Sequence, residues 1–127
     1  MKKIITTKNA PIPIGPYSQA LLINNTLYIS GQIAINPETG KFVMDNIIDE
    51  THMVMKNLHA ILKAGEMDFS NVVKATIFLL NMDQFSSVND VYGSYFKENF
   101  PARETMQAAG LPKNVNIEIS MIAVKGS

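Results

Sequence analysis

The sequence contains no cysteine and no tryptophan. The absence of cysteine excludes disulfide bonds, thiolate metal ligands and thiol nucleophiles together. Any metal ligand or nucleophile in this chain must therefore come from another residue type.

Neither sign of charge is in excess, because eleven Lys and Arg residues balance eleven Asp and Glu residues. A surface built for nucleic acid or for an anionic membrane normally shows a basic excess or a basic run, so we expect neither partner. No apolar stretch approaches the roughly 18–20 residues that span a bilayer. The opening segment 1–8 lacks the apolar region of a secretory signal. We therefore expect a cytoplasmic protein.

Arginine is almost absent. Ten of the eleven basic residues are lysines, and Arg103 in the tripeptide Pro101-Ala102-Arg103 is the only arginine. Lysine serves a surface that needs only positive charge, whereas a guanidinium is a planar, two-pronged donor that fits a carboxylate. Arg103 is therefore a candidate anion-binding residue, although a lysine-rich composition alone would also leave few arginines.

At 127 residues the chain is long enough for one domain and too short for two ordinary ones, so we expect a single domain over residues 1–127. Segments rich in β-branched and aliphatic residues predict strands. The segment 72–80 is mostly apolar, and we expect it to be central and covered on both faces. The predicted strands are 3–6, 17–23, 26–34, 72–80, 104–109 and 115–125.

Apolar residues recur at three- and four-residue steps in two segments, which predicts amphipathic helices over 46–64 and 82–99. Asp45 or Asn46 can cap the start of the first helix, and Gly65 can cap its end. The element order predicts a sheet of five to six strands, backed on one face by two helices of about five turns each. No element is left for the second sheet face, so self-association through it would solve the burial problem.

The two histidines, His52 and His59, lie seven residues apart on the first predicted helix. That spacing corresponds to roughly 10 Å of helical rise, too far for one metal ion with ligands at about 2 Å. We therefore expect no metal site there. Ser30 precedes Gly31 without the Gly-x-Ser-x-Gly pattern of a nucleophile elbow.

Three other residues stand out by their position. Tyr17 follows a rigid Gly15-Pro16 loop, Gly31 interrupts a strand, and Glu118 lies mid-strand among aliphatic residues. A tyrosine that caps the core, a β-bulge and a solvated carboxylate would explain them without function. A strand glycine can also mark a place where the backbone closely approaches another group.

Short motifs distributed over the whole chain resemble those of the RidA (YjgF) family. The matching segments are 10–11, 14–20, 29–33, 57–58, 88–89 with Tyr92 and Phe96, 101–103, and 111–112 leading to 117–119. Each fragment alone is weak, but the ordered set is specific.

The resemblance implies an α+β fold like that of the trimeric chorismate mutases, with a mixed sheet backed by two helices, and a homotrimer in which the sheets form a central barrel. It also implies hydrolysis of reactive 2-imino acids, such as 2-iminobutanoate and 2-iminopropanoate, to 2-keto acids and ammonia. The sites would lie between subunits and use neither cofactor nor metal. A small 2-imino or 2-keto acid would be the ligand.

By the same resemblance, Arg103 grips the substrate carboxylate and Glu118 holds a water and assists proton transfer. The Gly31 backbone approaches the carboxylate, and Tyr17 walls the pocket from across the interface. The remaining residues that line or support the site are Ser30, Asn89 and Thr105.

Two residues depart from the family pattern, since many members have a small or apolar residue at position 104 and cysteine at 105. If 104–109 is a strand, Glu104 points away from a pocket that Arg103 faces, toward solvent or a lysine. Two other functions remain open: a non-catalytic module that senses keto acids or amino acids, and an RNA-directed ribonuclease or translation inhibitor.

Overall fold

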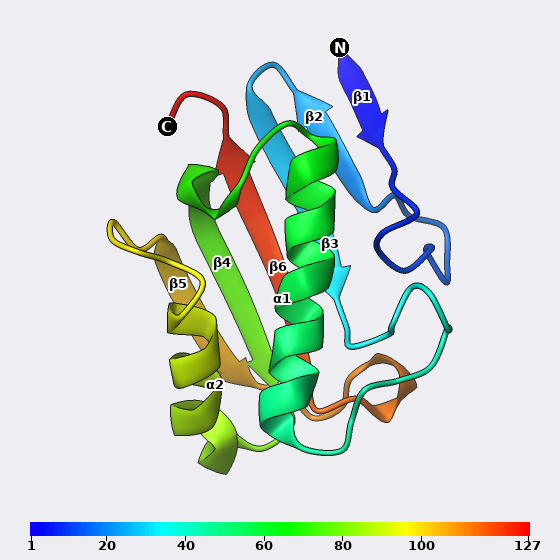
Figure 1. The fold of residues 1–127 in the computed structure, drawn as a ribbon, viewed down its shortest axis with the longest axis vertical. Helices are drawn as coiled ribbons and strands as arrows, with labels where there is room; N and C mark the ends of the chain where they lie inside the picture. The colour runs from blue at the N-terminus through cyan, green and yellow to red at the C-terminus, as the bar shows by residue number, and fades with distance from the viewer.

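The structure, a computed structural model, describes residues 1–127 and contains one six-stranded sheet with two α-helices on one of its faces (Figure 1). Three short 3₁₀ turns occupy Phe69–Asn71, Met82–Gln84 and Pro112–Asn114. The strands are β1 (Lys2–Ile5), β2 (Ala20–Ile23), β3 (Thr26–Gln32), β4 (Val72–Leu79), β5 (Ala102–Gln107) and β6 (Ile117–Val124); the helices are α1 (Ile47–Ala64) and α2 (Phe85–Gly93).

The strand order across the sheet is β1-β2-β3-β6-β4-β5. All neighbours are antiparallel except β4 and β5, which run parallel. The sheet is therefore mixed, and it is backed by two helices, as the sequence predicts.

The first helix is close to its prediction. The side-chain oxygen of Asn46 accepts a hydrogen bond from the Asp49 backbone at 2.8 Å, which caps the helix start. The Gly65 backbone N–H donates to carbonyl groups of the last turn, including that of Ile61 at 3.1 Å. Both predicted ends are confirmed.

The second helix is much shorter than the predicted 82–99. Its α-helical part ends at Gly93, where the Ser94 hydroxyl donates to the Val91 carbonyl at 2.6 Å. The chain then leaves the helix direction, and Asn99 takes a positive φ of 55°. Tyr95 and Phe96 continue the apolar period of the helix, but they lie in the segment after α2. From there they pack against Phe69.

The second strand begins at Ala20, not at the predicted Tyr17. Buried Gln19 holds the preceding loop through its side chain, which accepts from the Thr7 backbone N–H at 2.7 Å and donates to the Pro11 carbonyl at 2.8 Å. These bonds keep residues 17–19 in a loop conformation, so the strand pairing starts later.

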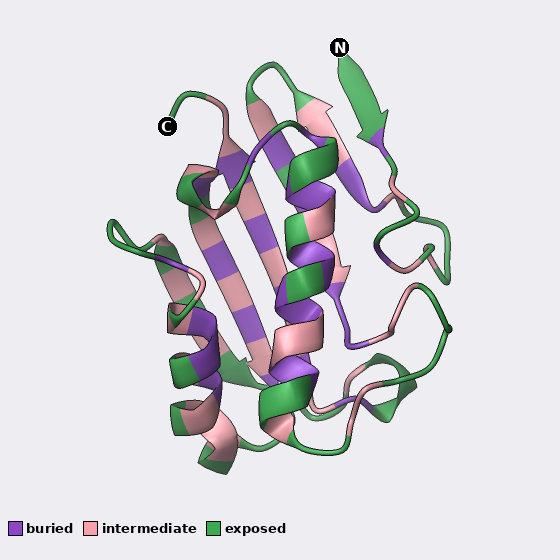
Figure 2. Ribbon diagram, in the orientation of Figure 1, coloured by how far each residue is buried: buried purple, intermediate pink, exposed green.

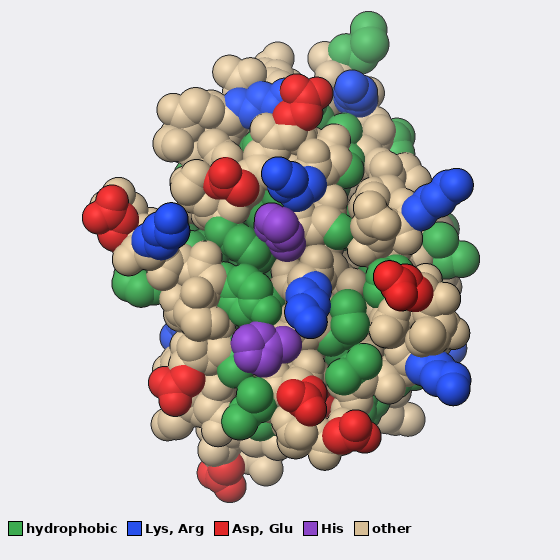
Figure 3. Space-filling model, viewed as in Figure 1, with side chains coloured by type: hydrophobic (Ala, Val, Ile, Leu, Met, Phe, Trp, Pro, Cys, Tyr) green, Lys and Arg blue, Asp and Glu red, His purple; other side chains and the backbone are tan.

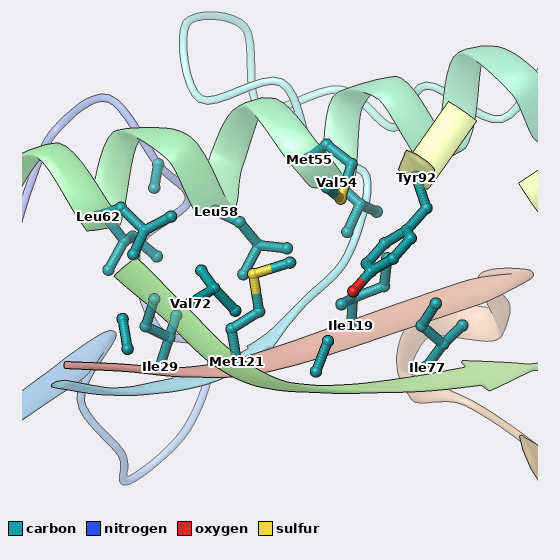
Figure 4. Close-up of a cluster of buried hydrophobic side chains, with 14 of the residues drawn as sticks. Ile29, Val54, Met55, Leu58, Leu62, Val72, Ile77, Tyr92, Ile119 and Met121 are labelled. Atoms are coloured by element: carbon teal, nitrogen blue, oxygen red, sulfur yellow. The ribbon is translucent and has the colours of Figure 1, made fainter. Parts of the chain in front are cut away.

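The hydrophobic core lies between the sheet and the helices (Figure 2). Side chains of the helices meet those of the central strands: Leu58 of α1 points toward Met121, and Tyr92 of α2 reaches toward Ile119 (Figure 4). Alternate residues of β6 are buried against the helices, as expected for a strand with one covered face.

The opposite sheet face carries no helix (Figure 1). On it, Phe78 and Ile122 are only half-buried, and Tyr28 is exposed. The prediction that both faces of β4 are covered is wrong for the single chain, because β4 alternates between buried and partly exposed residues. Neither helix combines the length and hydrophobicity needed to cross a membrane.

Candidate active site

Arg103 lies in β5 on the sheet face that the helices cover, because it is in register with buried Ala75 of β4. Its Nη1 donates to the Asn89 side-chain oxygen at 2.8 Å. The guanidinium carbon lies 5.6 Å from the ring centre of Phe85 and 5.2 Å from that of Tyr92. No carboxylate pairs with Arg103, since the one ion pair in the structure joins other residues.

Thr105 follows Arg103 on the same face of β5, in register with buried Ile77. Its hydroxyl oxygen is buried and has no hydrogen-bond partner, and the same holds for the hydroxyl of Tyr92. Burial raises the pKa of Tyr92 to about 12, against a smaller lowering by the positive charge of Arg103. The Tyr92 hydroxyl is therefore neutral at physiological pH.

A second group of candidate residues lines a cavity of about 400 Å³. Glu118 of β6 and Gly31 of β3 lie against each other: a Cβ placed on Gly31 would stand 2.6 Å from Glu118 Oε2. The pairing of β3 with β6 shifts register between Ile29 and Gln32, which is the bulge considered for this glycine. The cavity is lined by Ile14, Tyr17, Ser30, Gly31, Ile33, Pro112 and Glu118.

Local hydrogen bonds fix the polar side of this cavity. The Ser30 hydroxyl donates to the Ser18 carbonyl at 2.6 Å, and the Tyr17 hydroxyl accepts from the Ile14 backbone N–H at 3.2 Å. Tyr17 is 47% exposed, so it borders the cavity and does not cap the core. Burial raises the pKa of the half-buried Glu118 carboxyl above its ordinary value, so this carboxyl holds a proton more tightly than a solvated one does.

The seven predicted site residues form two groups that do not meet within one chain. Glu118 is in register with Phe78 of β4, whereas Arg103 is in register with Ala75, three residues away and on the opposite face. Strand β4 also separates the two residues laterally (Figure 1). Tyr17 was expected to oppose Glu118 and Gly31 from another subunit, but one chain brings these three residues together.

Glu104 points away from Arg103, as predicted. Its carboxylate pairs with the Lys74 ammonium at 2.7 Å and is exposed. The hydrogen bond from Lys74 and its positive charge lower the pKa of Glu104. One detail of the prediction is wrong: Arg103 does not end a loop, because β5 begins at Ala102. The alternation of side chains along the strand still sends the two residues to opposite faces.

The two histidines lie over α1 on the helix side of the molecule, with hydrophobic side chains between them (Figure 3). His52 Nδ1 is 2.7 Å from the Tyr95 hydroxyl oxygen, and the His59 ring stacks on Phe69 at 5.5 Å. Both contacts are made outside the two groups described above.

Sequence reasoning missed the contacts of Phe85 and Tyr92 with Arg103. The signal was present, since residues 85, 89 and 92 are spaced by four and three and so share one face of a helix. Aromatic residues at that spacing are equally typical of the apolar face of an amphipathic helix, which is what the period of 82–99 predicts.

The sequence model described as "Endoribonuclease L-PSP" matches residues 7–125. The chain belongs to this family, which is also called RidA or YjgF. A 2-iminobutanoate/2-iminopropanoate deaminase of Capra hircus is 48% identical over 126 residues, covering 99% of this chain and 92% of the relative. The human protein of the same name is 47% identical with the same coverage.

Solved structures of RidA-family proteins share the fold. A Rid-family protein, YyfA from Yersinia pestis, superposes with a TM-score of 0.95 at 48% identity and covers 98% of this chain and 99% of its own. Escherichia coli TdcF with bound serine superposes with a TM-score of 0.93 at 35% identity, covering 97% of this chain and 98% of its own. The RidA resemblance inferred from the motifs is confirmed.

Proposed function

We propose that this chain hydrolyses 2-imino acids such as 2-iminobutanoate and 2-iminopropanoate to 2-keto acids and ammonia, in the cytoplasm. Relatives named for this activity are nearly half identical over nearly the whole chain. The observation that carries the proposal is the pair of complementary groups: an arginine with no counter-ion on one sheet face and a half-buried carboxylate beside a cavity on the other.

The active site is formed between two subunits of a homotrimer. Within one chain the sheet separates Arg103 from Glu118, so neither group can complete the site alone. Arg103, Asn89 and Thr105 come from one subunit, and they meet Tyr17, Ser30, Gly31 and Glu118 of the next. The half-exposed apolar residues on the helix-free sheet face supply the surface that trimer formation buries.

In this site Arg103 receives the substrate carboxylate. Asn89 occupies one side of the guanidinium by accepting from Nη1, and a bidentate carboxylate fits the remaining donors. Gly31 has no Cβ, so its backbone can approach the bound acid. The carboxylate is thereby fixed, and with it the position of the adjacent C=N carbon.

Glu118 then activates the attacking water molecule. Its carboxylate takes a proton from a water molecule as the water oxygen bonds to the C=N carbon, and it passes that proton to the nitrogen, which gives a carbinolamine. Glu118 then takes the hydroxyl proton of the carbinolamine and delivers it to the amine nitrogen as the C–N bond breaks, so that ammonia leaves and the 2-keto acid remains. Imines are already electrophilic, so positioning and proton transfer are sufficient and no cofactor or metal is required.

The activity can be tested by coupling the protein to a threonine dehydratase and trapping the imine with semicarbazide. We expect the protein to divert 2-iminobutanoate to 2-ketobutyrate and to lower semicarbazone formation. If the protein binds 2-ketobutyrate but does not accelerate imine hydrolysis, it is a keto-acid sensor that uses the same arginine and not an enzyme. RNA cleavage by wild type that survives Arg103→Lys and Glu118→Gln, together with no deamination, would favour the ribonuclease named in the family description.

The assembly is tested by light scattering at micromolar concentration. We expect a species of three times the 14.0 kDa chain mass. A stable monomer with full activity would overturn the intersubunit site.

A further inference from the structure

The surroundings of Arg103 are neutral although the residue is half-buried. Its guanidinium is enclosed by the Phe85 ring, the Tyr92 ring and the Asn89 amide, all from one face of α2. The one ion pair of the structure, Lys74–Glu104, lies on the opposite face of the sheet.

A neutral environment of this kind holds a cation without cancelling its charge. Aromatic faces attract a guanidinium through their quadrupole, and this attraction strengthens when the group is partly removed from water. The Asn89 oxygen adds a directed hydrogen bond that fixes the orientation of Nη1. A carboxylate at the same place would fix the orientation equally well but would also satisfy the positive charge.

We propose that Phe85, Asn89 and Tyr92 are positioning residues that hold Arg103 oriented and without a counter-ion from its own subunit. No carboxylate of that subunit then competes with the ligand carboxylate for the guanidinium. This inference rests on the proposed function, because it takes a 2-imino or 2-keto acid as the ligand. It assigns to α2 the task of preparing the anion site before the ligand arrives.

The Tyr92 hydroxyl has no part in this arrangement, because it is buried without a hydrogen-bond partner. The ring alone acts on Arg103. Tyr92→Phe keeps the ring and removes an unsatisfied polar group, so we expect it to retain ligand affinity and the melting temperature. Tyr92→Leu removes the ring and should weaken binding.

The first experiment measures the dissociation constant of 2-ketobutyrate by calorimetry, together with KM and kcat for 2-iminobutanoate. We expect Phe85→Leu to raise the dissociation constant and KM about fivefold, the loss of one cation–π contact, with kcat within about twofold. Phe85→Tyr keeps the aromatic ring and should keep the dissociation constant and KM at their wild-type values. Phe69→Leu is the matched control, because Phe69 is also partly buried and aromatic but packs against His59 and Tyr95.

The second experiment separates charge from shape at position 89. Asn89→Asp keeps the size of the side chain and places a carboxylate where the amide oxygen accepts from Arg103 at 2.8 Å. We expect it to weaken 2-ketobutyrate binding at least tenfold, and more than Asn89→Ala does. A merely structural role would give the opposite order, because alanine disturbs the packing more than the near-isosteric aspartate.

Binding and turnover together distinguish the two proposals. Suppose that wild type binds 2-ketobutyrate without hydrolysing the imine, and that Asn89→Asp binds it more weakly than Asn89→Ala does. This result would support the positioning role and overturn the deaminase. Normal hydrolysis in Asn89→Asp and Phe85→Leu would overturn the positioning role and leave the deaminase. Wild type that neither binds nor hydrolyses would overturn both. If Tyr92→Leu does not fold, the variants at Phe85 and Asn89, which are only partly buried, still decide the question.

Discussion

The carboxylate of Glu118 fills the space that a side chain at Gly31 would need. An ideal Cβ on Gly31 would lie 2.6 Å from Glu118 Oε2, 2.8 Å from its Cδ and 3.0 Å from its Cγ. These distances are shorter than van der Waals contact, so the glycine and the carboxylate occupy adjoining positions that only a missing Cβ permits.

Gly31→Ala should therefore disable the reaction more than the fold. The added methyl group meets the far end of a flexible side chain, which can rotate away at small cost. We expect kcat to fall at least tenfold because the displaced carboxylate no longer meets the water. Steady-state kinetics and thermal melting of the same preparation measure both effects.

Gly93→Ala is the matched control, since a Cβ there meets nothing within 4 Å. It should keep wild-type kinetics. Unchanged kcat in Gly31→Ala would show that the position of Glu118 against Gly31 has no role in turnover.

Mixing two inactive variants should restore activity. Arg103→Ala chains keep the Glu118 group, and Glu118→Gln chains keep the Arg103 group, so a mixed trimer contains intact sites where the two kinds of chain meet in the right order. Equal co-expression should give about one quarter of wild-type activity, from random pairing at each interface. Activity no higher than that of the separate variants would place each site within one chain.

Glu118 also predicts a pH dependence of catalysis. Burial raises its pKa above the ordinary value of 4.5, and the carboxylate must be ionised to accept the proton from water. The acid limb of kcat/KM should therefore lie above pH 4.5, and Glu118→Gln should lose that limb together with most of kcat. A limb that persists in Glu118→Gln would assign the titration to another group.

The raised pKa of Glu118 also affects the stability of the fold, which should fall as pH rises while catalysis increases. Because the folded-state pKa is raised, the folded chain binds the proton more tightly than the unfolded chain, and this contribution is lost as pH rises from 4.5 through the folded pKa. The melting temperature of Glu118→Gln relative to wild type should rise over that interval. A relative melting temperature that falls instead would mean that the ionised carboxylate stabilises the fold.

Glu104→Ala should leave substrate binding unchanged. The carboxylate is exposed, pairs with Lys74 and lies on the opposite sheet face from Arg103, where water and salt screen it. We expect KM for 2-iminobutanoate within about twofold of wild type. A tenfold improvement, largest at low salt, would mean that this charge reaches the anion site.

Local signals in the sequence were sufficient for much of the fold. The α1 helix has an apolar period with capping residues at each end, so Asp45 or Asn46 could be predicted as its start and Gly65 as its end; the structure selects Asn46. The end of α2 could not, because Tyr95 and Phe96 keep the helical period while packing against Phe69, a contact set by tertiary structure.

The sequence names candidate site residues but does not predict their arrangement. Alternation along β5 correctly sent Glu104 away from Arg103. Which face each strand turns toward the helices depends on register, and only the pairing of Ala75 with Arg103 and of Phe78 with Glu118 places them on opposite faces. The apolar alternation within β6 predicts that Glu118 points away from the helices, but β5 has no such alternation to show which face Arg103 takes.

The place of β6 bears on how the chain reaches this structure. It is the last strand in chain order, yet it lies in the middle of the sheet, between β3 and β4. The β1–β3 meander and the β4–β5 pair share no backbone ladder of their own, so each remains a separate fragment until β6 inserts between them. Pairings so distant in sequence close large loops, which slows folding. During synthesis the sheet therefore stays divided, with two strand edges exposed, until the segment that contains Glu118 has been made.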